Sequence, residues 1–167
     1  MQIKQLIDED FVNYKKPSMF LGFPNCSFKC EKECGVRCCQ NSELALARSI
    51  EVPTHAIVDR FMNNPITSAI VCGGLEPFDS WESLQSLIMT LRYRSDADIV
   101  IYTGYTESEI KDKLHWLSLY ADDGPIVVKF GRFVPNQQSH FDSVLGVNLA
   151  SSNQYARRIS YESDGKL

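Results

Sequence analysis

The sequence lacks the features that would place its 167 residues in a membrane, in an export pathway or on a nucleic acid. No segment approaches the roughly 18 consecutive apolar residues of a transmembrane helix. Residues 1–16 contain no apolar stretch and no small-residue cleavage site, so no secretory signal is expected. The 17 basic residues are scattered among 21 acidic ones, which predicts no patch for phosphate groups. We therefore expect a cytoplasmic protein with no membrane and no nucleic-acid partner.

Internal repeats, low-complexity tracts and flexible linkers are also missing, so the sequence predicts one domain over residues 1–167. Apolar residues make up 44% of the chain, which is enough to bury a core without disulfide bonds. The three histidines lie far apart, and no Ser-His-Asp or Cys-His arrangement is visible. Conventional nucleophilic catalysis is therefore not expected.

What the sequence does contain is a cluster of cysteines. Five of the six lie within fourteen residues, in a segment that spans residues 24–41. In a chain without a predicted secretory signal, clustered thiols indicate metal ligands or redox groups rather than a disulfide framework. The sixth, Cys72, stands alone in an apolar run and is interpreted as a small buried core residue.

Apolar runs alternate with amphipathic segments along the rest of the chain. Strands are predicted over residues 18–23, 68–72, 98–102 and 125–130. Helices are predicted to follow an N-cap at Thr54 and two capping boxes, Asp79 with Glu82 and Thr106 with Glu109. Residues from about 132 to 167 are polar, and an irregular tail is expected there.

This alternation indicates parallel βαβ units and therefore an α/β fold. Four or five such units are too few for a closed eight-stranded barrel, so we expect a partial (open) β/α barrel with a largely parallel sheet. In parallel α/β proteins the functional groups gather at the carboxyl ends of the strands. Each predicted strand ends in a chemically suggestive sequence: cysteines, Gly-Gly, Thr-Gly or Gly-Arg.

The spacing of the cysteines restricts how they can bind one centre. Cys26, Cys30, Cys34 and Cys38 recur every four residues, and a continuous helix would separate the first and last by roughly 18 Å. A shared centre therefore requires a loop, and Gly35 permits the necessary backbone reversal. Thiolates suit both a tetrahedral zinc site and a [4Fe–4S] cluster held by three cysteines. The cysteines alone leave these two possibilities open.

Four separated motifs carry a family resemblance. They are Cys26-x3-Cys30 with the later Cys39-Gln40-Asn41, then Gly73-Gly74-Leu75-Glu76-Pro77, then Tyr102-Thr103-Gly104-Tyr105, and finally Ser151-Ser152-Asn153-Gln154. In order, approximate spacing and overall length the chain resembles the radical S-adenosylmethionine (SAM) activases of anaerobic ribonucleoside-triphosphate reductase. Each motif alone is weak evidence, but the four together cover most of the chain.

The resemblance implies a [4Fe–4S] cluster bound by Cys26, Cys30 and Cys39, with SAM at its open iron. It implies that such an enzyme cleaves SAM reductively and generates a radical on a glycine of a partner enzyme, the large subunit of anaerobic ribonucleotide reductase. A reducing donor such as flavodoxin would supply the electron. The residues that it assigns to cofactor binding are Asn41, Gly73, Gly74, Glu76, Tyr102, Thr103 and Asn153.

The sequence also departs from the family pattern, which indicates a divergent branch. Eight residues separate Cys30 from Cys39 where the usual loop has two, so Cys34 or Cys38 could replace Cys39 as the third ligand. Leu75 is inserted into the Gly-Gly-Glu element, and Phe130 stands where the family usually has Asp.

Simpler roles compete with several of these assignments. Glu76 could belong to a plain strand-to-helix turn, and Tyr102 with Thr103 could be core residues. Asn41 is slightly better explained as a helix cap. Asn153 and Gln154 could contact SAM or simply tie down the tail. Two other functions also stay open: a radical SAM enzyme acting on a small molecule, as deazapurine synthases do, and a zinc-binding module without catalysis.

Overall fold

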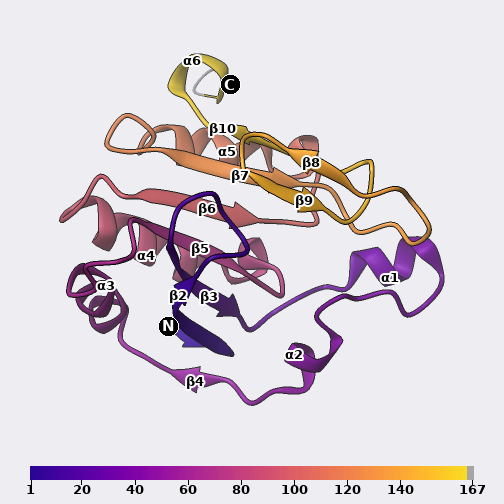
Figure 1. Cartoon of the computed structure of the whole chain (residues 1–167), viewed down its shortest axis with the longest axis horizontal. Coiled ribbons are helices and arrows are strands. Elements are labelled where there is room, and N and C mark those ends of the chain that lie inside the picture. Colours follow the sequence, from indigo (N-terminus) through magenta and orange to yellow (C-terminus); the bar gives the residue numbers. More distant parts are fainter. Residues whose placement is uncertain (165–167) are drawn as a thin grey trace.

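The computed structural model describes residues 1–164 and is built on a six-stranded mixed β-sheet (Figure 1). Its strands lie in the order β10–β7–β6–β5–β3–β2. The four central strands are parallel: β3 (Ser18–Phe23), β5 (Ala69–Gly74), β6 (Asp98–Tyr102) and β7 (Ile126–Phe130). The edge strands β2 (Gln5–Asp10) and β10 (Tyr155–Arg158) run antiparallel to their neighbours.

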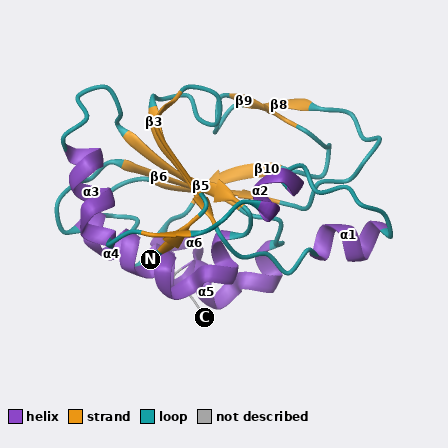
Figure 2. Ribbon diagram, turned by 90° about the horizontal axis from the view of Figure 1, so that it is seen from below, coloured by secondary structure: helices purple, strands orange, loops and turns teal. Residues whose placement is uncertain are grey.

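Helices cover one face of this sheet, and a β-hairpin covers the other (Figure 2). The helices are α3 (Thr54–Met62), α4 (Trp81–Arg92) and α5 (Lys111–Ser118), and the hairpin joins β8 (His140–Asp142) to β9 (Val147–Leu149). Side chains alternate between the faces of a strand. Ile70 and Cys72 of β5 therefore enter the core under the helices, while Ala69 and Val71 pack under the hairpin.

Short elements complete the described chain. β1 (Gln2–Ile3) pairs with β4 (Ile50–Glu51) in a separate two-stranded sheet. The others are α1 (Lys29–Cys34), α2 (Ser42–Leu46), the 3₁₀ turns η1 (Pro77–Ser80) and η2 (Glu107–Ile110), and α6 (Tyr161–Asp164). None of the helices within residues 1–164 is long and apolar enough to cross a bilayer.

The sequence predicted the centre of the fold well. All four predicted strands form, two of them with the expected boundaries, and they are parallel as the βαβ pattern indicated. The fold is therefore mixed α/β with a mostly parallel sheet. Strands β2 and β10 form its two edges. A partial β/α barrel of the radical SAM type stays a prediction.

Both ends of the chain are more regular than expected. Residues 1–16 contribute β1 and β2, and the segment expected as an irregular tail forms β8, β9, β10 and α6, while residues 165–167 lie outside the described residues. β1, β8, β9 and β10 have at most four residues, and β2 and β10 are edge strands with one exposed face. Their sequences are therefore too short or too polar to show a recognisable apolar pattern.

The helix starts show where local sequence rules succeed and fail. α3 begins at Thr54, but the N-cap position is the preceding residue, so the predicted cap is wrong by one residue. The capping box of Thr106 with Glu109 is confirmed, with the Thr106 N–H 2.9 Å from Glu109 Oε2. The box predicted at Asp79 does not form. Asp79 instead accepts a hydrogen bond from the Ser27 N–H at 2.6 Å.

Candidate functional site

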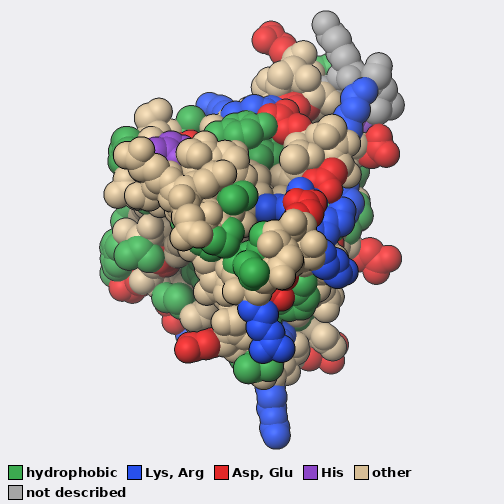
Figure 3. Space-filling model, turned by 90° about the vertical axis from the view of Figure 1, so that its right-hand side faces the viewer, with side chains coloured by type: hydrophobic (Ala, Val, Ile, Leu, Met, Phe, Trp, Pro, Cys, Tyr) green, Lys and Arg blue, Asp and Glu red, His purple; other side chains and the backbone are tan. Residues whose placement is uncertain are grey.

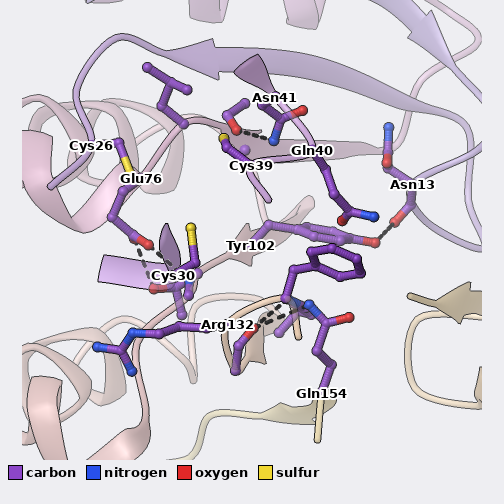
Figure 4. A pocket seen from close by; sticks show the side chains of 18 of the residues that line it. Asn13, Cys26, Cys30, Cys39, Gln40, Asn41, Glu76, Tyr102, Arg132 and Gln154 are labelled. Carbon is purple, nitrogen blue, oxygen red and sulfur yellow. Dashed lines mark hydrogen bonds between the residues drawn. The ribbon is translucent and has the colours of Figure 1, made fainter. Parts of the chain in front are cut away.

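A cavity of about 210 Å³ opens at the carboxyl ends of the parallel strands (Figure 4). This volume is more than ten times the roughly 15 Å³ that one water molecule needs, so the cavity can hold a ligand. Each parallel strand contributes a lining residue: Phe20 from β3, Gly73 from β5, Tyr102 from β6 and Lys129 from β7. The site thus lies where parallel α/β folds place their chemistry.

Three cysteines from the segment after β3 line this cavity. They are Cys26, Cys30 and Cys39, the set that the sequence favoured as ligands. Figure 4 shows Cys26 and Cys30 near Glu76, and Cys39 next to Asn41. Burial raises the pKa of the Cys26 thiol to about 11 and also raises the pKa of Cys30. Without a bound cation these two thiols are therefore neutral at pH 7, and metal binding would release their protons.

The backbone of the cysteine segment folds back on itself. α1 ends at Cys34, and Gly35, at a φ of 71°, closes it by donating its N–H to the Glu31 carbonyl at 2.9 Å. The Cys39 N–H then donates to the Glu31 side chain at 3.2 Å. This return accounts for the eight residues between Cys30 and Cys39. The expectation that the segment is not one continuous helix is confirmed.

An ion-pair network holds α1 against the rest of the site. Glu109 of η2 accepts hydrogen bonds from Lys29 of α1 at 3.1 Å and from Arg132, after β7, at 2.5 Å. Arg132 also lies 3.3 Å from Glu33 of α1, and it holds the pKa of Glu109 well below its usual range. Such partly exposed pairs contribute up to about 1 kcal/mol each, so their main effect is to position α1.

Glu76 occupies a buried position in the cavity wall. Its carboxylate accepts hydrogen bonds from the Thr103 hydroxyl at 2.8 Å and from the N–H groups of Gly104 at 2.9 Å and Phe78 at 3.2 Å. Burial raises its pKa to about 7, although these hydrogen bonds act in the opposite direction. A carboxylate offers about four acceptor sites. Three are used within the protein, which leaves one for a ligand.

The Gly-Gly element lets the backbone pass close to its neighbours. Gly74 has a φ of 80°, and a Cβ atom there would lie 2.7 Å from the Cα atom of Gly22 on β3. The Asn41 side-chain amide donates to the Gly74 carbonyl, which joins the end of the cysteine segment to the end of β5. Asn41 occupies the N-cap position of α2 but makes no side-chain capping bond, so the capping role is wrong.

Tyr102 and Thr103 both line the cavity at the end of β6. The Tyr102 hydroxyl donates to the Asn13 carbonyl at 2.6 Å, and burial raises its pKa above the ordinary value. Thr103 donates to Glu76 and accepts from the Tyr105 N–H at 3.0 Å. Thr103 therefore fixes the orientation of Glu76, and Tyr102 forms a flat wall of the cavity (Figure 4).

Lys129 is a site residue that sequence reasoning missed. It is only 7% exposed, and its ammonium donates to the Gly131 carbonyl at 2.8 Å. Burial lowers its pKa to about 8, and Glu76 is the acidic group that opposes this shift. No carboxylate within residues 1–164 forms an ion pair with it. The signal was present, because Lys129 is the one charged residue of an otherwise apolar strand.

The C-terminal motif secures the strand that carries Lys129. The Gln154 side chain lines the cavity, accepts from the Ser151 N–H at 3.1 Å and donates to the Gly131 carbonyl at 3.2 Å. Asn153 is not among the lining residues, and it donates to the Arg132 carbonyl at 2.8 Å. This motif ties the tail to the end of β7, which is one of the two roles that the sequence predicted for it. A cofactor contact by Asn153 stays a prediction.

The remaining cysteines lie outside the cavity wall. The sulfur atoms of Cys34 and Cys38 are 2.9 Å apart, and neither residue lines the cavity. Cys72 is fully buried in the core under the helices, as expected, and burial raises its pKa. The histidines expected on helices, His55 and His115, lie on α3 and α5.

The donor set suits a [4Fe–4S] cluster. Three thiols line one cavity. Tetrahedral zinc needs four donors at about 2.0–2.3 Å from one point. A cluster instead binds thiolates at separate iron atoms. The site therefore defines an α/β protein suited to an iron–sulfur cluster.

Comparison with known proteins agrees with this assignment. Residues 18–155 match the family described as 4Fe-4S single cluster domain, which spans most of the chain from β3 to the first residue of β10. The chain belongs to this family. No curated protein and no solved structure matches it significantly.

Proposed function

We propose that this protein is a radical SAM enzyme that generates a glycyl radical on a partner, anaerobic ribonucleotide reductase. Cys26, Cys30 and Cys39 would hold the [4Fe–4S] cluster. When reduced by a donor such as flavodoxin, a cluster with an open iron would supply the electron for cleaving the sulfonium of SAM. The observation that carries the proposal is that three thiols, Glu76 and Lys129 line one cavity.

The charges of the cavity complement an amino-acid ligand. Glu76 keeps one acceptor site for an ammonium group, and a nearby cation would return its raised pKa toward the ordinary value. Lys129 has one of its three N–H groups bonded and lies without a counter-ion in the described chain, so it favours a carboxylate. The methionine end of SAM carries both groups. The two residues would therefore orient it and screen it from water.

Access from the surface supports a protein substrate. Gln40 and Asn41 line the cavity and are exposed, so its rim reaches solvent beside the cysteine segment. On the face that carries α1, acidic and basic side chains are interspersed with apolar ones, and no patch of one sign dominates (Figure 3). Such a mixed surface suits a protein loop better than a nucleic acid.

The experiment is to measure SAM binding and radical formation with the anaerobically reconstituted protein. Glu76→Gln should weaken SAM binding about tenfold or more, because a charge-assisted hydrogen bond is lost. Glu82→Gln, which alters an exposed acid at the start of α4, is the matched control and should bind SAM normally.

The product of the reaction distinguishes the proposed function from its alternative. A glycine-centred radical on the reductase, detected by electron paramagnetic resonance, would support the proposal. SAM cleavage without a radical on the reductase would favour the small-molecule alternative. If Glu76→Gln and Glu82→Gln bind SAM equally well, the assigned role of Glu76 is wrong.

A further inference from the structure

The cysteine segment contains a pair of thiols that the proposed cluster does not use. Cys34 and Cys38 do not line the cavity, and their sulfur atoms are 2.9 Å apart. A disulfide bond is about 2.0 Å long, so less than about 1 Å of movement would join them. Gly35, at a φ of 71°, provides the turn between them, and residues 35–37 are all exposed. Both the geometry and the access needed for oxidation are therefore present.

We propose that Cys34 and Cys38 form a reversible disulfide that keeps the ligand thiols free when the cluster is absent. Cys38 has a second thiol neighbour, since Cys30 lies close enough to help raise the pKa of the Cys38 thiol. A bond between Cys30 and Cys38 would remove a proposed ligand from the cavity. Pairing with Cys34 instead keeps Cys38 away from Cys30 and leaves the cavity wall intact.

The oxidant in this step is a small-molecule disulfide such as oxidised glutathione. The thiolate of one cysteine of the pair attacks one sulfur of the oxidant, breaks its S–S bond and releases one thiol. The thiolate of the other cysteine then attacks the mixed disulfide and releases the second thiol. The protein loses two protons and two electrons, and the oxidant is reduced to two thiols. A reducing dithiol reverses both steps.

The pairing is tested by mapping disulfides in the cluster-free protein after treatment with oxidised glutathione. Peptide mass spectrometry should find one linkage, Cys34–Cys38, with Cys26, Cys30 and Cys39 still open to alkylation. A linkage that includes any of these three residues, or the absence of any linkage, would overturn the inference. This experiment needs no cluster, so its result is informative even if the proposed radical SAM function is wrong.

Two matched variants test the protective role. After the same treatment, Cys34→Ser should form the Cys30–Cys38 linkage and lose most of its capacity to take up iron. Cys38→Ser cannot form that linkage, so it should keep the iron capacity of the untreated protein. If both variants lose iron capacity equally, the pair has no protective role.

Alkylation of the cluster-loaded protein under anaerobic conditions gives a further check. The cluster should protect Cys26, Cys30 and Cys39, while Cys34 and Cys38 react. Protection of Cys34 or Cys38 in place of Cys39 would make it a ligand and overturn the inference. These readouts are independent of any enzymatic activity.

Discussion

Replacing Lys129 with methionine should make the protein more stable and, at the same time, a weaker binder of its ligand. Burial lowers the Lys129 pKa from 10.5 to about 8. Each pKa unit corresponds to about 1.4 kcal/mol, so burying the ammonium costs roughly 3 kcal/mol. Methionine has a similar length and carries no charge. It would forfeit the hydrogen bond to Gly131, worth about 1 kcal/mol. The free energy of unfolding at pH 7 should therefore rise by about 2 kcal/mol.

The effect on binding has the opposite sign. Loss of a charge-assisted hydrogen bond to the ligand carboxylate costs about 1.5–3 kcal/mol. SAM affinity should therefore fall about ten- to a hundredfold. Denaturant unfolding and isothermal titration of the same preparations would measure both quantities. Lys113→Met is the matched control, because Lys113 is also partly buried and donates to the Phe78 carbonyl but does not line the cavity.

The pH dependence of stability gives a second signature for Lys129. Its folded pKa, about 8, lies below the unfolded value of 10.5, so the unfolded chain binds more protons between these values. The unfolding free energy of the wild type should gain a rising contribution from about pH 8 to 10.5, and Lys129→Met should lack it. A variant that is less stable at pH 7 yet binds SAM normally would refute the reasoning, because Lys129 would then have a structural role only.

Two further predictions concern the scaffold. Gly74→Ala should lower the unfolding free energy by about 1–3 kcal/mol. The φ of Gly74 lies in the left-handed region, and the added Cβ atom would be too close to the Cα atom of Gly22. Gly35→Ala, with similar φ but open space around it, should cost only about 1 kcal/mol, and equal losses would contradict the contact argument. Leu84→Ala in the helix-side core should cost about 2–5 kcal/mol, as thermal unfolding would show. Met89→Ala, on an exposed face of α4, should change stability little.

The sequence was sufficient for the centre of this fold because its strands are apolar and buried on both faces. The segments that became β3 and β6 are continuous apolar runs between polar turns, and such runs specify buried strands. The strands β2 and β10 lie at the sheet edges with exposed side chains, so their sequences carry no comparable pattern. Helix caps such as that of α4 failed because Asp79 bonds to residues distant in sequence, which local rules do not include.

The candidate site shows the same division. The Gln40-Asn41 that follows Cys39 favoured Cys39 over Cys34 as the third ligand, and that ligand assignment stays a prediction. Cys39 does line the cavity, and Cys34 does not, because the hydrogen bonds to Glu31 fold the segment back. Lys129 was not assigned to the cavity wall, because its position depends on how β7 pairs with β6 and β10. Tertiary structure alone brings such a side chain into the cavity wall, and no local sequence pattern predicts that position.

The most direct test of the account is iron reconstitution of the anaerobic protein, followed by metal analysis and titration with SAM. The account predicts about four iron atoms per chain and a broad thiolate-to-iron absorption band that SAM perturbs. Cys39→Ser should abolish this iron binding, whereas Cys34→Ser should retain it under anaerobic conditions. Stoichiometric zinc, without cluster iron and without a response to SAM, would contradict the central claim.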